Sequence, residues 1–199
     1  KINYRANIQA LKNADVSEII AVNAVGGITE AMTPCCIVIP DQLIDYTHGR
    51  VDTFFEENLK EVTHIDFTAP YSESLRQELI NAADSNNIDV YSNGTYAVTQ
   101  GPRLETAAEI IKYEKDGCDI VGMTSMPEAS LARELEMDYA CCSLVVNGAA
   151  GKTDEIITMD PKTSVHPHDY FSIEEGGKVY WFDQRSIIQW SQKELEIKN

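Results

Sequence analysis

Three short apolar runs between residues 94 and 151 each end in polar residues at the start of a loop. This repetition constrains the fold more than any other feature of the chain. Leu104-Glu105 comes after the first run, directly behind Gly101-Pro102 and Arg103. Met123-Thr124 comes shortly after Ile120-Val121 in the second run, and Asn147 ends the third run. Open α/β sheets place their ligands where a strand ends and a loop or helix begins. These junctions therefore contain the candidate site residues.

Alternating strand and helix patterns along the chain predict an α/β fold with a mixed central β-sheet flanked by helices. The segment Ile88–Thr99 reads as a hairpin with its turn at Asn93-Gly94. Pro102 fits the first turn of a helix that ends at Gly117, with a buried face made by Leu104, Ala107, Ala108 and Ile111. Other helices are expected at 6–14, at 73–85 after the N-cap Ser72, and from Pro127, and other strands at 19–22, 37–39, 42–47, 120–123 and 139–146.

The length of 199 residues suggests one domain with a sizeable core. The pattern changes near Pro161, so we expect a domain over residues 1–160 and an unassigned segment over 161–199. Within that segment, 178–182 reads as a strand and 186–197 as a helix. His166-Pro167-His168 reads as a solvated loop rather than a ligand pair.

A net charge of −16 without a Lys/Arg cluster argues against nucleic acid and anionic membranes as partners. No apolar run is long enough to cross a membrane, and the first residues lack the shape of a signal peptide. The five cysteines form no CxxC pair, and Cys141 and Cys142 lie in an apolar run. We expect a cytoplasmic protein with reduced, buried cysteines and no metal site.

Two features allow alternative interpretations from the residues alone. Gly26-Gly27, read as a turn after a strand, either brings the backbone close to a ligand or makes a plain turn. Phe54-Phe55, in a polar surface excursion over 48–61, either caps a pocket or subunit contact or forms a small satellite cluster.

The segments GPRLETAAEI and VGMTSMPEASLARE resemble the trimeric purine nucleoside phosphorylase and methylthioadenosine phosphorylase family. The similarity extends upstream through NAVGGI, QLIDYT and HIDFTAPY to residues 3–7, and these flanks resemble the S-methyl-5'-thioinosine phosphorylase branch most. The similarity to the family ends near Asp160. The family's Gly-Ser phosphate loop and Arg-His pair would precede residue 3, so they are not among residues 1–199. Relatives usually have Gly-Asp where this chain has Cys35-Cys36.

The resemblance implies a role for six residues. Ala24 would offer its backbone N–H to phosphate, and Thr124 its hydroxyl. Met123 would pack on the ribose and Leu104 on the base. Glu105 and Asn147 would hydrogen-bond the purine, and Asn147 would assist catalysis by stabilising the departing base. Without the resemblance, Glu105 reads as a solvated first-turn carboxylate favoured by the helix dipole.

Glu105 and Asn147 together indicate a 6-oxopurine. The N1–H of such a base is a donor and an ionised carboxylate only accepts, whereas the N1 of a 6-aminopurine is a bare acceptor. Adenine-preferring relatives tend to have Asp at the position of Asn147 and often a second Asp where this chain has Ala149. Leaving a buried polar group unpaired costs about 1–3 kcal/mol, enough for a clear preference.

The resemblance implies phosphorolysis of S-methyl-5'-thioinosine to hypoxanthine and 5-methylthioribose 1-phosphate. Phosphate is the co-substrate, no metal or organic cofactor is needed, and the family assembly is a homotrimer. The alternatives are phosphorolysis of inosine or guanosine, methylthioadenosine phosphorolysis, and a non-catalytic remnant of the fold.

Overall fold

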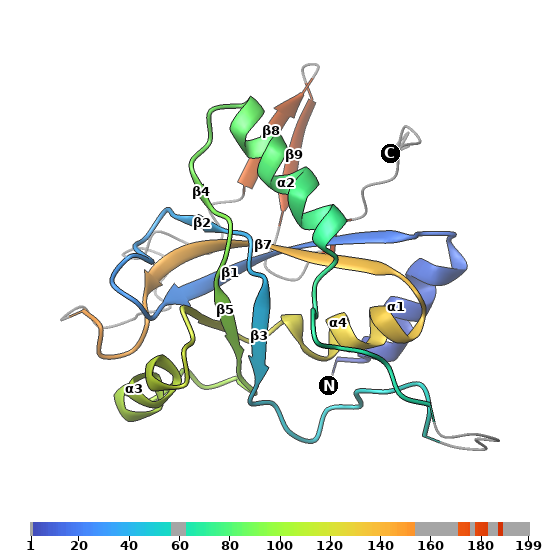
Figure 1. Ribbon diagram of the computed structural model, residues 1–199, viewed down its shortest axis with the longest axis horizontal. Coiled ribbons are helices and arrows are strands. Elements are labelled where there is room, and N and C mark those ends of the chain that lie inside the picture. The colour runs from blue at the N-terminus through green and yellow to red at the C-terminus, as the bar shows by residue number, and fades with distance from the viewer. Residues whose placement is uncertain (1, 57–62, 154–170, 176–177, 183–186, 189–199) are drawn as a thin grey trace.

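The computed structural model describes residues 2–56, 63–153, 171–175, 178–182 and 187–188. Its centre is a curled, mixed sheet in the strand order β3-β5-β6-β1-β7-β2-β4, with β10 paired to β1 (Figure 1). This confirms the predicted fold class. The sheet strands are β1 (Glu18–Gly27), β2 (Ile37–Val38), β3 (Gln42–Asp45), β4 (Val90–Tyr91), β5 (Thr95–Val98), β6 (Ile120–Gly122), β7 (Asp138–Gly148) and β10 (Ile187–Ile188).

The parallel pair of β1 and β7 forms the spine of the sheet. Side chains alternate along β1, where Ile19, Ala21, Asn23 and Val25 are buried and the residues between them are partly exposed. β7 follows the same period through Tyr139, Cys141, Ser143 and Val145. The register shifts by one residue after Val25, so that Gly26 lies opposite Asn147.

Within the described residues, four helices cover the sheet: α1 (Tyr4–Asn13), α2 (Glu73–Ser85), α3 (Ala107–Lys115) and α4 (Ser125–Glu134). In Figure 1, α1 and α4 lie below β7 and α2 lies above it. The main core contains Ile8 of α1 and Leu131 of α4 together with the inward residues of β1 and β7. The helix expected at 73–85 has those bounds, and Ser72 caps it as predicted.

The structure corrects the hairpin predicted over 88–99. β4 pairs with β2 at one edge of the sheet, whereas β5 pairs with β3 and β6 near the other. Asn93-Gly94 therefore links two strands that are not neighbours. The Asn-Gly signal is local, and the pairing is decided by longer-range contacts.

The helix predicted from Pro102 begins later than expected. Thr106 caps α3 through a capping box with Glu109, so Pro102 and Leu104 lie in the preceding loop. The predicted buried face is wrong as well, since Leu104 and Ile111 are 42% and 51% exposed. Ile110 and Tyr113 are the buried residues of α3.

In the C-terminal segment, β8 (Phe171–Glu175) and β9 (Lys178–Phe182) form an antiparallel pair, which confirms the strand at 178–182. Residues 187–188 form β10, so the helix predicted over 186–197 is wrong at these two positions. The remaining residues of that helix, and His166-Pro167-His168, lie outside the described part of the chain.

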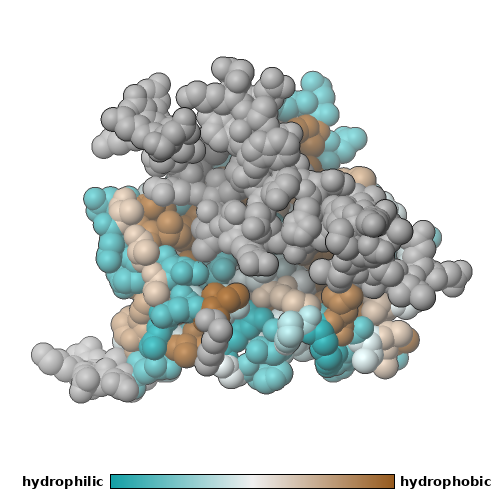
Figure 2. All heavy atoms as spheres, turned by 180° about the vertical axis from the view of Figure 1, so that it is seen from behind, coloured by the Kyte–Doolittle hydropathy of each residue, from teal (hydrophilic) through white to brown (hydrophobic). Residues whose placement is uncertain are grey.

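Figure 2 shows the molecule from behind, where hydrophobic residues of the described part are interrupted by hydrophilic ones. None of the helices in the described ranges combines the length and the apolar character needed to cross a bilayer.

Candidate active site

The site is built around an interruption in the ladder on one edge of β1. On that edge, β10 pairs with Ile20 and Ala21, and β6 pairs with Gly26 and Gly27. Ala24 lies between the two, and within the described residues no strand covers it there. The N–H of Ile28 donates toward the β6 side, to Asp119 O at 2.8 Å. Because backbone groups alternate along a strand, the N–H of Ala24 points toward this interruption as well.

Met123 and Thr124 leave the sheet beside Ala24. β6 runs antiparallel to β1 with Val121 opposite Gly26, and continuing that register places Met123 opposite Ala24. The hydroxyl of Thr124 does not cap α4; its oxygen lies 3.4 Å from the hydroxyl of Tyr96. Burial raises the pKa of Tyr96, so its phenol stays protonated and is available to hydrogen-bond Thr124.

Glu105 is held by the end of the neighbouring strand. The backbone N–H of Thr99 donates to Gly122 O at 2.7 Å, which places Thr99 beside the start of the Met123-Thr124 segment. The hydroxyl of Thr99 then donates to Oε1 of Glu105 at 2.7 Å. Glu105 thus precedes α3 and is fixed by Thr99; it is not the solvated first-turn carboxylate of the alternative interpretation.

Gly101 lets the loop before Glu105 pack closely on Met123. Its φ is +63°, in the left-handed region, and a Cβ there would overlap the sulfur of Met123. The ribose-contact candidate and the base-contact loop are therefore in direct contact.

Asn147 lies near the end of β7, opposite Gly26. Its Nδ2 donates to Gly148 O at 2.7 Å, and Nδ2 lies 3.5 Å from the position a Cβ on Gly26 would take. Gly26 and Gly27 belong to β1, which corrects the expected turn after the strand. A side chain on Gly27 would collide with the backbone of Met32, so the absence of a Cβ here allows close packing within the chain; approach to a ligand stays a prediction.

Five of the six candidates thus lie on or beside four neighbouring strands, β5, β6, β1 and β7. Leu104 differs: its side chain is largely exposed on the loop before α3. Among the described residues it does not pack on the core. Its side chain is therefore exposed in this structure, and a base would contact it from the solvent side of the loop.

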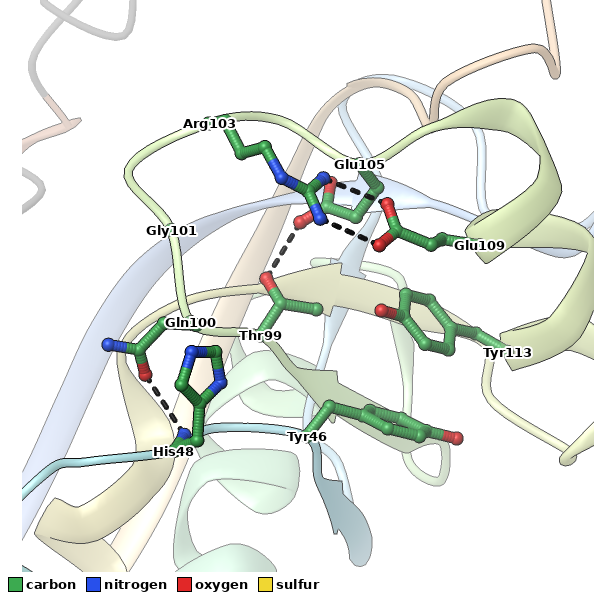
Figure 3. A pocket seen from close by; sticks show the side chains of 9 residues that line it. All are labelled: Tyr46, His48, Thr99, Gln100, Gly101, Arg103, Glu105, Glu109 and Tyr113. Carbon is green, nitrogen blue, oxygen red and sulfur yellow. Dashed lines mark hydrogen bonds and ion pairs between the residues drawn. The ribbon is translucent and has the colours of Figure 1, made fainter.

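A cavity of about 480 Å³ adjoins the site on the α3 side (Figure 3). Of the candidates it contains only Glu105; the other lining residues are Tyr46, His48, Thr99, Gln100, Gly101, Arg103, Glu109 and Tyr113. Arg103 reaches across to Glu109 with distances of 2.9 and 2.7 Å. This ion pair and the backbone N–H of Thr106 lower the pKa of Glu109 to about 2.

Sequence reasoning missed Arg50, which lies in the segment interpreted as a surface excursion. The described part of this segment, residues 48–56, contacts α4: the backbone N–H of Phe54 donates to Glu134 at 2.7 Å, and the hydroxyl of Thr53 donates to the same carboxylate at 2.6 Å. Phe54 packs against the main core, so it does not form a separate satellite cluster; a role in a pocket or subunit contact stays a prediction. A single Arg in a polar stretch gives no sequence signal that its side chain will lie at the candidate site.

A buried polar layer lies behind the site. Tyr139 donates to Glu128 at 3.0 Å, and burial raises the pKa of Glu128 to about 7, opposed by this bond and by Arg50. Burial also raises the pKa of both Cys141 and Cys142 to about 11, which keeps these thiols protonated at neutral pH. All five cysteines are free. Within the described ranges, no group of three or more His, Cys, Asp or Glu side chains is arranged to hold a metal ion.

Comparison with known proteins supplies the family. The family model of the phosphorylase superfamily matches residues 1–166. The chain belongs to the phosphorylase superfamily. A superfamily relative from Pseudomonas syringae pv. tomato, a probable S-methyl-5'-thioinosine phosphorylase, is 60% identical over 159 residues, which are 80% of this chain and 65% of the relative. The 6-oxopurine nucleoside phosphorylase of Pyrococcus furiosus is 49% identical over 163 residues, covering 79% of this chain and 62% of that protein.

The phosphorylase fold is also shared with solved structures. A methylthioadenosine phosphorylase from Schistosoma mansoni in complex with adenine superposes with a TM-score of 0.75 at 35% identity, covering 78% of this chain and 60% of that one. These comparisons confirm the family resemblance and the fold. The chain spans less than two thirds of the length of these two curated relatives, 65% of the first and 62% of the second.

Proposed function

We propose that the protein catalyses phosphorolysis of a 6-oxopurine nucleoside, with S-methyl-5'-thioinosine as the preferred substrate. The products would be hypoxanthine and 5-methylthioribose 1-phosphate. The names of several relatives, at 52–60% identity, support this substrate. The observation that carries the proposal is the hydrogen bond from Thr99 to Glu105.

That bond decides which oxygen of Glu105 is left for the base. The hydroxyl of Thr99 has one proton, and its alternative acceptor, Gly122 O, is farther away at 3.3 Å than Glu105 Oε1 at 2.7 Å. Donating that proton to Oε1 requires an unprotonated oxygen there and leaves Oε2 for the base. Oε2 has no hydrogen-bond donor among the described residues. An N1–H of a 6-oxopurine supplies the missing donor, and the bare N1 of a 6-aminopurine does not.

Asn147 serves the leaving group in this proposal. As negative charge develops on the departing purine, the amide Nδ2 can donate to O6 or N7, because it can exchange its present acceptor, Gly148 O, for the base. An aspartate in its place would be acceptor-only and would oppose that charge. The absence of a second acid two residues on, where the chain has buried Ala149, agrees with a 6-oxopurine.

Ala24 and Thr124 are proposed to hold phosphate below the sugar. The N–H of Ala24 faces the interruption in the ladder, and Thr124 follows Met123, which the β6 register places opposite Ala24. Positioning the nucleophile under the positive charge that develops at C1' converts an encounter into an intramolecular attack. Met123, adjacent to both, is proposed to contact the ribose, and Leu104 the base. No organic cofactor or metal has a role in this scheme.

A second candidate is phosphorolysis of inosine or guanosine. It is favoured by the 49% identity to the 6-oxopurine nucleoside phosphorylase of Pyrococcus furiosus. The base argument is the same for both candidates; only the 5' substituent differs. We further propose a homotrimer located in the cytoplasm, in line with the expectations from sequence.

The test is release of the free base by the purified protein, hypoxanthine from S-methyl-5'-thioinosine and inosine and adenine from S-methyl-5'-thioadenosine, each with and without phosphate. Phosphate-dependent release with the highest kcat/KM for S-methyl-5'-thioinosine supports the proposal. A higher value for inosine selects the second candidate, and preference for the adenine nucleoside contradicts the base argument. Hypoxanthine binding without turnover of any substrate would identify a non-catalytic remnant.

A further inference from the structure

Arg50 uses every hydrogen-bond donor of its guanidinium within the site. Nη2 donates to Thr99 O at 2.9 Å and to Gln100 O at 3.0 Å. Nη1 donates to Met123 O at 2.9 Å and to Met126 O, and Nε donates to the side-chain oxygen of Gln100 at 3.2 Å. An arginine has five N–H donors in a rigid fork, and here all five have an acceptor.

The acceptors belong to two different segments, the loop that follows β5 and the stretch from the end of β6 into the start of α4. Thr99 and Gln100 begin the loop that carries Glu105, whereas Met123 and Met126 flank Thr124. One side chain therefore bridges the end of β5 and the end of β6, beyond the point where the ladder between them stops at Val98 and Gly122. Four of the five acceptors are backbone carbonyls, so the bridge fixes the path of both loops rather than a pair of side chains.

The position of Arg50 is itself fixed. Its guanidinium carbon lies 5.4 Å from the ring centre of Tyr4 on α1. Among the described residues, no carboxylate oxygen lies within 4.0 Å of it, so Arg50 is not a member of an ion pair there. A lysine would keep the charge, but it has three donors on a single nitrogen and cannot span two loops.

We propose that Arg50 is a positioning residue that couples the base-binding loop to the phosphate-binding segment. Phosphate held at Ala24 and Thr124 orders the Met123–Met126 segment, and Arg50 transmits this order to the loop that holds Glu105. The inference rests on the proposed function for the identity of the two ligands. It goes beyond that function by making binding of one ligand dependent on the other.

Hydrogen exchange of the wild-type protein tests the coupling without any turnover. Inorganic phosphate should slow exchange at residues 99–106 as well as at 122–127, although phosphate contacts only the second segment in the proposal. Slowing confined to 122–127 would overturn the inference. This measurement does not depend on any variant being folded.

Arg50→Lys is the matching variant. We expect faster exchange in both segments, and roughly tenfold higher KM values for nucleoside and for phosphate, because the loss of buried hydrogen bonds of this kind has about that effect. In the variant, phosphate should no longer slow exchange at 99–106. Exchange and KM values within about twofold of wild type would overturn the proposal.

Arg133→Lys is the control. Arg133 also donates to two backbone carbonyls, Asp66 O at 2.8 Å and Ala69 O at 2.7 Å, but these precede α2. It should raise exchange near 66–70 and leave the phosphate effect at 99–106 intact. If wild type turns over no nucleoside, the proposed function fails by that assay alone, while the exchange data still decide whether Arg50 couples the two loops.

Discussion

The hydroxyl of Thr99 donates a 2.7 Å hydrogen bond to Oε1 of Glu105, six residues along the chain. Thr99 is 5% exposed, and its backbone is fixed on both sides, by Gly122 O and by Arg50. The loop between the two residues packs on Met123 through Gly101. Glu105 is consequently positioned by the sheet, although it lies in a loop.

Removal of the Thr99 hydroxyl tests this relationship. In Thr99→Val the carboxylate loses its only donor among the described residues, and we expect about a tenfold loss of kcat/KM for S-methyl-5'-thioinosine, equivalent to about 1.4 kcal/mol. Steady-state kinetics provide the measurement. Thr99→Ser keeps the hydroxyl and should retain most of the activity; equal losses in both variants would point to packing rather than hydrogen bonding.

Exchange of the amide at position 147 for a carboxylate should change the base preference. In Asn147→Asp, the acceptor-only side chain opposes charge on a departing 6-oxopurine, and it can accept from the exocyclic amine of adenine. The ratio of kcat/KM for S-methyl-5'-thioadenosine to that for S-methyl-5'-thioinosine should rise at least about tenfold. Asn81→Asp, on the exposed face of α2, adds the same charge and should leave the ratio unchanged.

Glu128 makes folding stability depend on pH. Burial raises the pKa of Glu128 to about 7, above its ordinary value of 4.5, so the folded state binds this proton more tightly than the unfolded state. The contribution is full below about pH 4.5 and is lost as pH rises through about 7, with a total on the order of 3 kcal/mol. Urea unfolding of Glu128→Gln between pH 5 and 8 should show a flatter profile than wild type.

Two other glutamates serve as references for the pH dependence of stability assigned to Glu128. Glu109 has its pKa lowered to about 2, so its contribution is lost only as pH falls through that value, outside the window tested. Glu136→Gln, at an exposed position after α4, is the control and should keep the wild-type slope. A Glu128→Gln slope that matches wild type would contradict the assignment.

Cys35 stands in a backbone conformation suited to glycine. Its φ is +75°, and its N–H donates to Val145 O at 2.8 Å. A side chain in this region costs about 1–2 kcal/mol, partly offset by the greater unfolded-state freedom of glycine. Cys35→Gly should therefore raise the free energy of unfolding by about 0.5–1 kcal/mol in chemical denaturation. Cys35→Ala keeps the Cβ and should not; a gain in both variants would assign the effect to the thiol.

The sequence predicts elements well where local signals agree. Ser72 and the spacing of apolar residues place α2 correctly because cap and periodicity lie within one segment. For α3, Pro102 predicts a start that is too early, because the helix begins at the capping box formed by Thr106 and Glu109. The preference of proline for the first turn and the capping box predict different starts for this helix. The capping box decides the start because it satisfies more backbone N–H donors.

The site could be predicted only as far as its motifs reach. Glu105, Thr124 and Asn147 follow from strand ends and from family resemblance, whereas Arg50 does not. Its acceptors lie 49 to 76 residues away along the chain, and nothing in its immediate neighbours indicates them. The hairpin error has the same origin, since β5 is paired with strands on both sides of it in the sequence rather than with its neighbour β4.

The central strand β1 also determines when the molecule can assemble during synthesis. Its partners in the described sheet all come much later: Gly27 pairs with Ile120, Glu18 with Asp138, and Ile20 with Ile188. A nascent chain ending before β6 therefore holds an apolar strand without any of these partners. Such segments are exposed to aggregation until long-range contacts form, so the ribosome-bound intermediate of this protein should be a client for chaperones that shield apolar strands.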